Sequence, residues 1–273
     1  MRMSIKTRFA PSPSGLMHLG NARTALLSAL AGNRMLLRIE DTDQARSRTE
    51  FVTELLTDLR WLGIEWHEGP RAADTDPEYF QSRRGPVYRV LYERLFEQGK
   101  VYPCFCSPQE LEISRKVQLG SGRPPRYGGR CASLAPDEAA TRLAAGEPAT
   151  LRFRVSKGEV IAFDDVVRGL HRFNSDDIGD FVIQRADGSP AFFFCNAVDD
   201  ALMGVDLVLR GEDHLSNTPR QLMVLSALDL PCPRYAHISL IVGDDGAPLS
   251  KRNGSRSIGQ LRSEGYFPSA VVN

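Results

Sequence analysis

The run RFAPSPSGLMHLGNART, residues 8–24, constrains the fold more than any other part of the chain. Residues 5–10 are short, apolar and partly alternating, which is typical of a strand. Residues 11–15, PSPSG, cannot continue a strand, and from Asn21 onward alanines and leucines recur at helical spacing. This order of strand, tight loop and helix start is a phosphate-binding layout, because the first-turn N–H groups and the helix dipole attract an anion.

Three residues at this turn could contact such an anion. Gly20 lets the backbone approach a ligand closely, and His18 can donate to a phosphate oxygen; Asn21 opens the helical pattern. The loop lacks the glycine pattern and the lysine of a common nucleotide-binding loop. From pattern alone, an ordinary strand-to-helix loop with a surface histidine is therefore an equal alternative.

The motif residues carry a resemblance that is more specific than the pattern. His18-Leu19-Gly20-Asn21 resembles the HIGH signature of class I aminoacyl-tRNA synthetases, and the whole run is similar to the glutamyl-tRNA synthetases. The resemblance implies an α/β fold: a Rossmann-like parallel sheet split by an α+β insertion that grips the tRNA acceptor end. It implies a first catalytic half at 1–100, a zinc-bearing insertion at 101–191, a second catalytic half at 192–246, and a KMSKS-like loop with a truncated stem-contact region at 247–273.

Bulk properties limit the classes of protein that this chain could belong to. The 273 residues, 42% of them hydrophobic, suffice for one large or two modest globular domains. Lys+Arg 34 against Asp+Glu 34 gives net charge +0, so any RNA-binding surface must be a local patch. Without a long apolar run or a signal peptide, no membrane partner is expected. Five cysteines suit a reducing compartment, so we expect a monomeric cytoplasmic enzyme.

Residues 34–39, RMLLRI, predict a second buried strand, followed by Glu40 in the acidic run EDTD. Carboxylates at the end of a strand beside a phosphate loop stand where open α/β sheets bind ligands, although a solvated acidic loop would look the same. The resemblance implies that Glu40 helps to hold a substrate amino group. Strand and helix alternate here, which predicts a parallel sheet.

Two helices follow this second strand in the prediction. A capping box of Ser47 and Glu50 begins a helix that ends at Gly63. A second helix covers residues 87–98, with its inward face formed by Val87, Val90, Leu91 and Leu95.

Three cysteines close together in sequence suggest a metal site. Cys104, Cys106 and Cys131 could bind zinc as thiolates if a fourth ligand exists, and buried structural cysteines are the alternative. The resemblance to synthetases and their tRNA-modifying relatives implies Tyr127 as that fourth ligand. Four protein ligands would make the zinc structural.

The sequence pattern in the middle of the chain predicts an α+β segment. Residues 151–155 and 160–163 alternate like paired strands around a Lys157-Gly158 turn, and residues 180–184 predict another strand before an Asp187-Gly188 turn. We expect the main sheet to resume at Phe192 in the apolar run FFFCN, and to continue with a buried strand at 206–209.

The later motifs extend the resemblance along the chain. RGEDHLSNTPRQ matches glutamyl synthetases closely, which implies that Arg210 pairs with the substrate side-chain carboxylate and that Arg8 is a second arginine of the pocket. A guanidinium fork suits a carboxylate and excludes an amide. Phe192 stands where relatives commonly carry tyrosine. The run APLSKRNG resembles the KMSKS signature, with Pro248 in place of its first lysine; alone it would be a common surface loop.

The site residues implied by the resemblance form two overlapping sets. The glutamate site comprises Arg8, Ala10, Ser12, Glu40, Phe192, Asn196 and Arg210. The ATP site comprises Ser12, His18, Gly20, Asn21, Glu212, Ser250, Lys251 and Arg252. The residues assigned to catalysis are His18, Asn21 and Lys251.

The implied reaction is ATP- and Mg²⁺-dependent activation of L-glutamate and its transfer to tRNA(Glu). A glutamyl-queuosine tRNA(Asp) synthetase is the near alternative: Tyr127 and Cys131 favour it, whereas RGEDHLSNTPRQ and the tail GYFPSAVVN favour the true synthetase. A non-catalytic glutamate- or RNA-binding regulator and a generic nucleotidyltransferase are further alternatives. The helical pattern is still open at Asn273, so we expect a catalytic fragment that could be inactive without its anticodon-binding domain.

Overall fold

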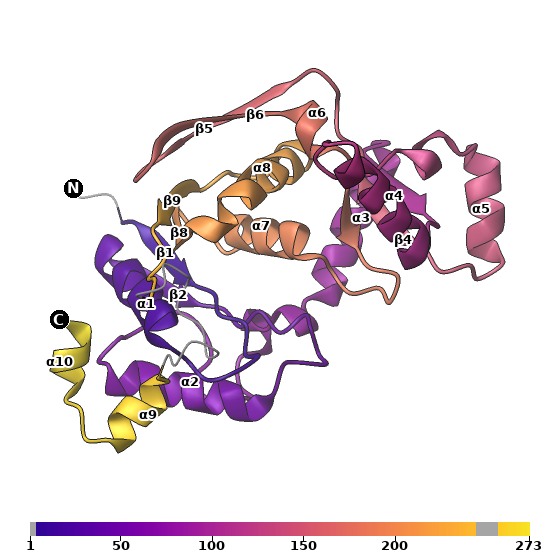
Figure 1. Cartoon of the computed structure of the whole chain (residues 1–273). Helices are drawn as coiled ribbons and strands as arrows, with labels where there is room; N and C mark the ends of the chain where they lie inside the picture. The colour runs from indigo at the N-terminus through magenta and orange to yellow at the C-terminus, as the bar shows by residue number, and fades with distance from the viewer. Residues whose placement is uncertain (1–3, 244–255) are drawn as a thin grey trace.

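The computed structural model describes residues 4–243 and 256–273, and its centre is a six-stranded sheet (Figure 1). The strand order is β2-β1-β8-β9-β5-β6, in which the first five strands run parallel and β6 pairs antiparallel with β5. A second, three-stranded antiparallel sheet has the order β3-β4-β7. The strands are β1 Lys6–Phe9, β2 Arg34–Leu37, β3 Val101–Cys104, β4 Thr150–Phe153, β5 Val160–Asp165, β6 Gly169–Asn174, β7 Phe181–Gln184, β8 Leu207–Gly211 and β9 Arg234–Ile238.

Helices connect and cover these strands. The α-helices are α1 Leu19–Ala31, α2 Thr49–Trp61, α3 Gly85–Glu97, α4 Pro108–Gly120, α5 Pro136–Ala144, α6 Ser175–Ile178, α7 Phe192–Leu202, α8 Thr218–Ala227, α9 Ile258–Ser263 and α10 Pro268–Val272. Short 3₁₀ turns occupy η1 Pro77–Tyr79, η2 Gln81–Arg83, η3 Arg130–Ser133 and η4 Glu212–Asn217. Within the described ranges, no helix is both long and apolar enough to cross a membrane.

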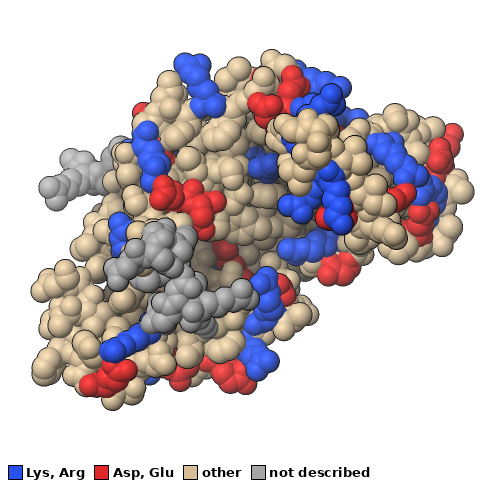
Figure 2. All heavy atoms as spheres, in the orientation of Figure 1, with Lys and Arg blue, Asp and Glu red and all other residues tan. Residues whose placement is uncertain are grey.

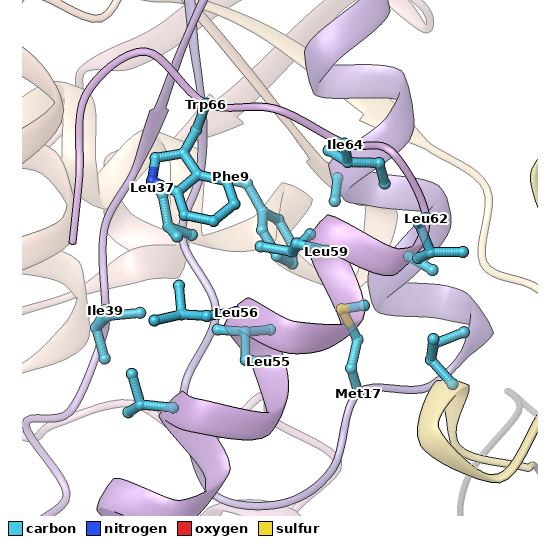
Figure 3. Packing of buried hydrophobic residues seen from close by; sticks show 14 of the residues in the cluster. Phe9, Met17, Leu37, Ile39, Leu55, Leu56, Leu59, Leu62, Ile64 and Trp66 are labelled. Carbon is cyan, nitrogen blue, oxygen red and sulfur yellow. The ribbon is translucent and has the colours of Figure 1, made fainter. Parts of the chain in front are cut away.

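The predicted strand-loop-helix unit at the start of the chain is confirmed. Parallel β1 and β2 are joined by α1, and the core beneath them is closed by the apolar face of α2. Figure 3 shows Phe9 of β1 and Leu37 of β2 facing Leu56 and Leu59 of α2, with Trp66 beside them. This packing fixes the ends of β1 and β2, from which the site is built.

The insertion at 101–191 is not wholly separate from the main sheet. The β3-β4-β7 sheet, with α4 and α5, projects to one side in Figure 1. The long β5-β6 hairpin, in contrast, extends the main sheet through pairing of β5 with β9. The predicted hairpin between 151–155 and 160–163 is therefore wrong, because β4 and β5 belong to different sheets. Alternation of apolar and polar side chains predicts that a segment is a strand, but it does not show which other strand it pairs with.

Three further predictions about local structure are wrong. Residues 192–196 begin α7 rather than a strand; α7 is buried on nearly all sides, so its sequence shows no helical period. The helix predicted to begin at Ser47 begins at Thr49, and its N-cap Arg48 makes no side-chain capping bond. Val87 and Val90 face outward on α3, where Tyr88 and Tyr92 are buried with Leu91 and Leu95.

Asp58 at the junction of α2 and α9 gives the fold a pH dependence. Its side chain is 1% exposed, and although Arg262 Nη1 lies 3.1 Å from Asp58 Oδ1, neither Asp58 oxygen has a hydrogen-bond partner within the described residues. Burial raises the pKa of Asp58 to about 6, and Arg262 only partly opposes this. Because the folded pKa lies above the unfolded value, the free energy of unfolding falls as pH rises from about 4 to about 6.

We expect Asp58→Asn to remove this penalty and to stabilise the fold by about 1–2 kcal/mol at pH 8, after allowing for the lost attraction to Arg262. At pH 4 the variant and the parent should be nearly equal. Denaturant unfolding at both pH values measures the difference, with Asp164→Asn on exposed β5 as the control. Destabilisation of Asp58→Asn at pH 8 would mean that the ion pair outweighs burial.

Candidate active site

The candidate site is a cleft at the carboxyl ends of the adjacent parallel strands β2, β1 and β8. It has a volume of about 650 Å³, and Figure 2 shows a hollow in this face with both cationic and acidic side chains around it. Neighbouring strand ends supply Glu40, Arg8 and Arg210, as expected for a ligand site in an open α/β sheet. The cleft is also lined by Ala10, Ser12, His18, Gly20, Asn21, Phe192 and Asn196.

His18 forms the N-cap of α1 through a reciprocal pair of hydrogen bonds. The N–H of Gly20 donates to His18 Nδ1 at 3.1 Å, and the N–H of His18 donates to Asn21 Oδ1 at 3.3 Å. Because Nδ1 accepts, the neutral imidazole carries its proton on Nε2 and is a donor there. A Cβ at position 20 would lie 3.0 Å from His18 Cε1, so glycine leaves room for this ring. The turn can therefore offer an imidazole N–H and a helix N-terminus to an anion.

Arg210 is a buried cation whose hydrogen-bond partners within residues 4–243 and 256–273 are all neutral. It is 4% exposed. Its Nε donates to His237 Nε2 at 3.1 Å, and one Nη donates at 2.7 Å to both Thr218 Oγ1 and Gln221 Oε1. The other Nη has no hydrogen-bond partner among the described residues, and burial lowers the pKa of Arg210 to about 10. A buried guanidinium with an unused donor on a cleft is a site for an anionic ligand.

Arg8 and Arg38, in contrast, have carboxylate partners. Asp200 lies 3.3 Å from Arg8 Nε and 2.7 Å from Arg38 Nη1, and Glu40 lies 3.2 Å from Arg38 Nη2. Among the described residues, Arg210 forms no ion pair with a carboxylate, so its charge is the one that an anionic ligand would balance.

Glu40 is connected to Arg210 by a chain of amides. Asn196 Nδ2 donates to Glu40 Oε1, Gln221 Nε2 donates to Asn196 Oδ1 at 2.8 Å, and Gln221 Oε1 accepts from Arg210. Burial raises the pKa of Glu40, and Arg38 opposes that rise. This chain fixes the carboxylate and the guanidinium relative to each other across the cleft.

The charged run that follows β8 lies only partly in the cleft. Glu212 is not among the residues that line the cleft: it forms an ion pair with Arg168 and accepts from the N–H of Leu240 at 3.2 Å. Its neighbours Asp213 and His214 do line the cleft, and His214 stacks with Phe192 at a centroid distance of 5.4 Å. The aromatic ring of Phe192 thus forms part of the wall without offering a hydroxyl.

Ser250, Lys251, Arg252 and Pro248 lie outside the described residues. The chain on either side of this segment reaches the cleft, since Ile241 lines it and Ser257 forms an antiparallel bridge with His18. The N–H of Ile258 also donates to the carbonyl of Met17 at 2.8 Å. The turn near the start of the chain and α9 near its end are therefore held together.

The three predicted cysteine ligands come together in the insertion. Their sulfur atoms lie within 4.8 Å of one another, and Cys106 and Cys131 are 3.6 Å apart. The Tyr127 hydroxyl lies 3.4 Å from Cys104 Sγ and 3.5 Å from Cys106 Sγ. Burial acts to raise the pKa of Cys104, but hydrogen bonds with Tyr127 and Arg152 outweigh it and lower the pKa to about 7, whereas burial and the neighbouring cysteines raise the pKa of Cys106 to about 11. One of the thiols is therefore readily ionised.

Sequence reasoning missed the residues that hold the pocket arginines in place. Asp200 pairs with Arg8 and Arg38, and Thr218, Gln221 and His237 hold Arg210. Two signals were available. Thr218 and Gln221 lie within the run RGEDHLSNTPRQ, and an acidic pair stands in the mostly apolar segment 192–202, where buried carboxylates need cationic partners.

Comparison with known proteins places the chain in a family. Residues 4–273 match the model for tRNA synthetases class I (E and Q), catalytic domain. Glutamate–tRNA ligase 1 of Methylococcus capsulatus is 72% identical over 270 residues, and glutamate–tRNA ligase 2 of Alkalilimnicola ehrlichii is 59% identical over 274 residues. The match covers 99% of this chain in both cases, and 58% and 57% of those ligases.

Solved structures agree with this result. A glutamate tRNA ligase from Elizabethkingia meningosepticum, in complex with its amino acid, has a TM-score of 0.85 and 30% identity, with 98% of this chain and 59% of that chain covered. The glutamate-tRNA synthetase of Elizabethkingia anophelis has a TM-score of 0.88 at 30% identity, with 98% and 60% covered. The fold is that of the class I tRNA synthetases. Within that class, the chain belongs to the E and Q family and spans less than two thirds of the length of these relatives.

Proposed function

We propose that this chain activates L-glutamate with ATP to form glutamyl-adenylate, as the catalytic part of an enzyme that transfers the glutamyl group to the 3′ end of tRNA(Glu). The observation that carries this proposal is Arg210, which has an unused donor and no ion-pair partner among the residues that the structure describes, in a cleft that also holds the His18 turn. An arginine of this kind selects a carboxylate over an amide. The names of the relatives, all glutamate–tRNA ligases, support glutamate as the amino acid.

The charges of the cleft suggest how glutamate would lie. Its side-chain carboxylate would take the unused donor of Arg210, and its ammonium group would face Glu40. The α-carboxylate would then point to the N-terminus of α1, where the triphosphate is expected.

In the proposed reaction the α-carboxylate attacks the α-phosphorus of ATP and pyrophosphate leaves. No general base is required because the nucleophile is already an anion, so catalysis consists of positioning and charge stabilisation. The His18 imidazole and the first-turn N–H groups of α1 would stabilise the negative charge on the phosphate. Magnesium bound to the triphosphate would add positive charge there. The assignments of Lys251 to the pyrophosphate, of Asn21 to catalysis and of Glu212 to the ribose stay predictions.

Exchange of labelled pyrophosphate into ATP tests this proposal. We expect exchange with L-glutamate in the presence of tRNA(Glu), and at least 100-fold less with L-glutamine or L-aspartate. Charging assays that offer tRNA(Glu) and queuosine-bearing tRNA(Asp) separate the proposed activity from that of the glutamyl-queuosine enzyme. Binding of glutamate without ATP binding or exchange would instead support a non-catalytic regulator. The cytoplasmic location and the monomeric state stay predictions.

We also propose that Cys104, Cys106, Tyr127 and Cys131 hold a structural zinc ion. Zinc–sulfur bonds of about 2.3 Å in a tetrahedron place sulfur atoms roughly 3.8 Å apart, close to the 3.6 Å between Cys106 and Cys131. The donor set of three thiols and a phenol therefore fits the ion. Zinc would fix the insertion, which is expected to contact the acceptor end of tRNA.

Zinc analysis of the purified chain should give about one ion per molecule. Cys106→Ser should lose most of the metal, and both this change and chelation should lower the melting temperature. Cys232→Ala is the matched control, since Cys232 is an exposed thiol outside the cluster. Equal zinc content in the two variants would rule out the assigned ligands.

A further inference from the structure

Behind Arg210 lies a buried histidine–carboxylate pair with no part in the reaction proposed above. His237 of β9 is fully buried, and its Nδ1 lies 2.5 Å from Asp165 Oδ2 at the end of β5. Its other ring nitrogen, Nε2, accepts from Arg210 Nε at 3.1 Å. The three side chains thus form a line from the β5-β6 hairpin to the wall of the cleft.

The bonding partners define one tautomer for this histidine. Arg210 can only donate, so Nε2 of His237 must be an acceptor and the ring proton must lie on Nδ1. Thr218 supports the same tautomer: its hydroxyl accepts from Arg210 at 2.7 Å, and it lies 3.2 Å from His237 Nε2, where its own proton can be donated. Two donors therefore converge on a single lone pair.

Asp165 is held so that it favours this tautomer. Its Oδ1 accepts from the backbone N–H groups of Val167 and Arg168, each at 3.0 Å, and from the N–H of His237 at 3.1 Å. Burial acts to raise the pKa of Asp165, but these donors and the His237 ring outweigh it, so the pKa is lowered. An ionised carboxylate fixed at Nδ1 keeps the proton there and leaves Nε2 open to Arg210.

We infer that His237 and Asp165 are positioning residues which aim the Arg210 guanidinium at the acidic side chain of the substrate. The inference rests on the proposed function, because it assumes that Arg210 binds the carboxylate of glutamate. A neutral acceptor holds the Nε edge of the guanidinium without cancelling its charge, whereas a carboxylate in the same place would compete with the ligand. The pair thereby contributes to the selection of glutamate without touching it.

Two substitutions at one position separate this role from a simple packing role. In His237→Gln the side-chain carbonyl can reach the place of Nε2 and still accept from Arg210. In His237→Asn the amide reaches only the place of Nδ1, so the contact with Asp165 can remain while Arg210 loses its acceptor. His171→Asn is the control, since His171 lies on β6, two strands away from β9, and is not among the residues lining the cleft.

Calorimetric titration of each variant with L-glutamate and, separately, with ATP measures the effect. We expect His237→Asn to weaken glutamate binding about 10- to 100-fold, the cost of one hydrogen bond to a charged group. Glutamine at 237 should restore affinity to within about threefold of the parent. His171→Asn should match the parent, and ATP binding should be unchanged in all variants. Equal affinity for glutamate in the asparagine and glutamine variants would overturn the inference.

The ring tautomer of His237 in the unsubstituted chain gives a reading that does not depend on the folding of any variant. The chain has five histidines, and ¹⁵N-histidine labelling resolves which nitrogen of each carries the proton. A proton on Nδ1 of His237 between pH 6 and 9 is expected, because burial lowers its pKa to about 4; a proton on Nε2 would overturn the inference. If the parent binds no glutamate, the proposed function fails, and the tautomer still decides the arrangement of the pair.

Discussion

Replacing Arg210 with glutamine is expected to weaken the binding of L-glutamate by about 100- to 1000-fold, because removing one partner of a buried charge pair costs roughly 3–4 kcal/mol. The substitution removes the cation that faces the cleft with an unused donor. Isothermal titration with L-glutamate measures the loss. ATP binding should change little, since the His18 turn is built from other residues.

Two further variants help to interpret the loss of glutamate affinity in Arg210→Gln. Arg210→Lys keeps the charge, but a lysine has only three donors and no planar fork, so it cannot hold His237, Thr218 and Gln221 and also bind the ligand. Its affinity for glutamate should be intermediate. Arg89→Gln on the exposed face of α3 is the control and should bind as the parent does. Glutamate binding by Arg210→Gln at parental strength would mean that another residue of the cleft recognises the side-chain carboxylate.

Replacing His18 with alanine is expected to slow the formation of glutamyl-adenylate by about 100- to 1000-fold while glutamate affinity changes little. The imidazole sits at the start of α1, where charge on the phosphate is expected to develop, and not beside Arg210. Pyrophosphate exchange in the presence of tRNA(Glu) measures the rate. The substitution also removes the N-cap, worth about 1 kcal/mol of stability.

His18→Asn separates the two effects. Asparagine can accept the N–H bond at the helix start, so this variant should keep the parental melting temperature. It lacks the imidazole N–H and should be slow in exchange, like the alanine variant. If His18→Asn exchanged pyrophosphate at the parental rate, the imidazole would have only its capping role.

Local sequence signals predicted the segments that depend on local chemistry. The PSPSG cluster, and the helical spacing of alanines and leucines after Asn21, predicted the order of β1, loop and α1. The structure confirms this order. Partner choice between strands is not local, so β4 and β5 were wrongly paired. Because α7 is buried on nearly every side, its apolar residues do not recur at the helical spacing that would distinguish a helix from a strand.

For the site, the residues at strand ends and in motifs could be predicted. The residues His237 and Asp165, which hold Arg210 in place, could not. Arg8, Glu40 and Arg210 were found from the motifs and line one cleft. His237 lies 27 positions after Arg210, and Asp165 lies 72 positions before His237. Nothing in their local sequence marks them as a pair. Only the order of the strands, with β9 between β8 and β5, brings them behind the arginine.

The central claim is that the buried guanidinium of Arg210, which has no carboxylate partner in the described part of the chain, makes this cleft specific for an acidic amino acid. Titration of the unsubstituted chain with L-glutamate and with L-glutamine, in the same buffer and with ATP present, tests it most directly. The account predicts that glutamine, which has the same shape but an uncharged amide, binds at least about 100-fold more weakly than glutamate. Equal binding of the two amino acids, or tighter binding of glutamine, would contradict it.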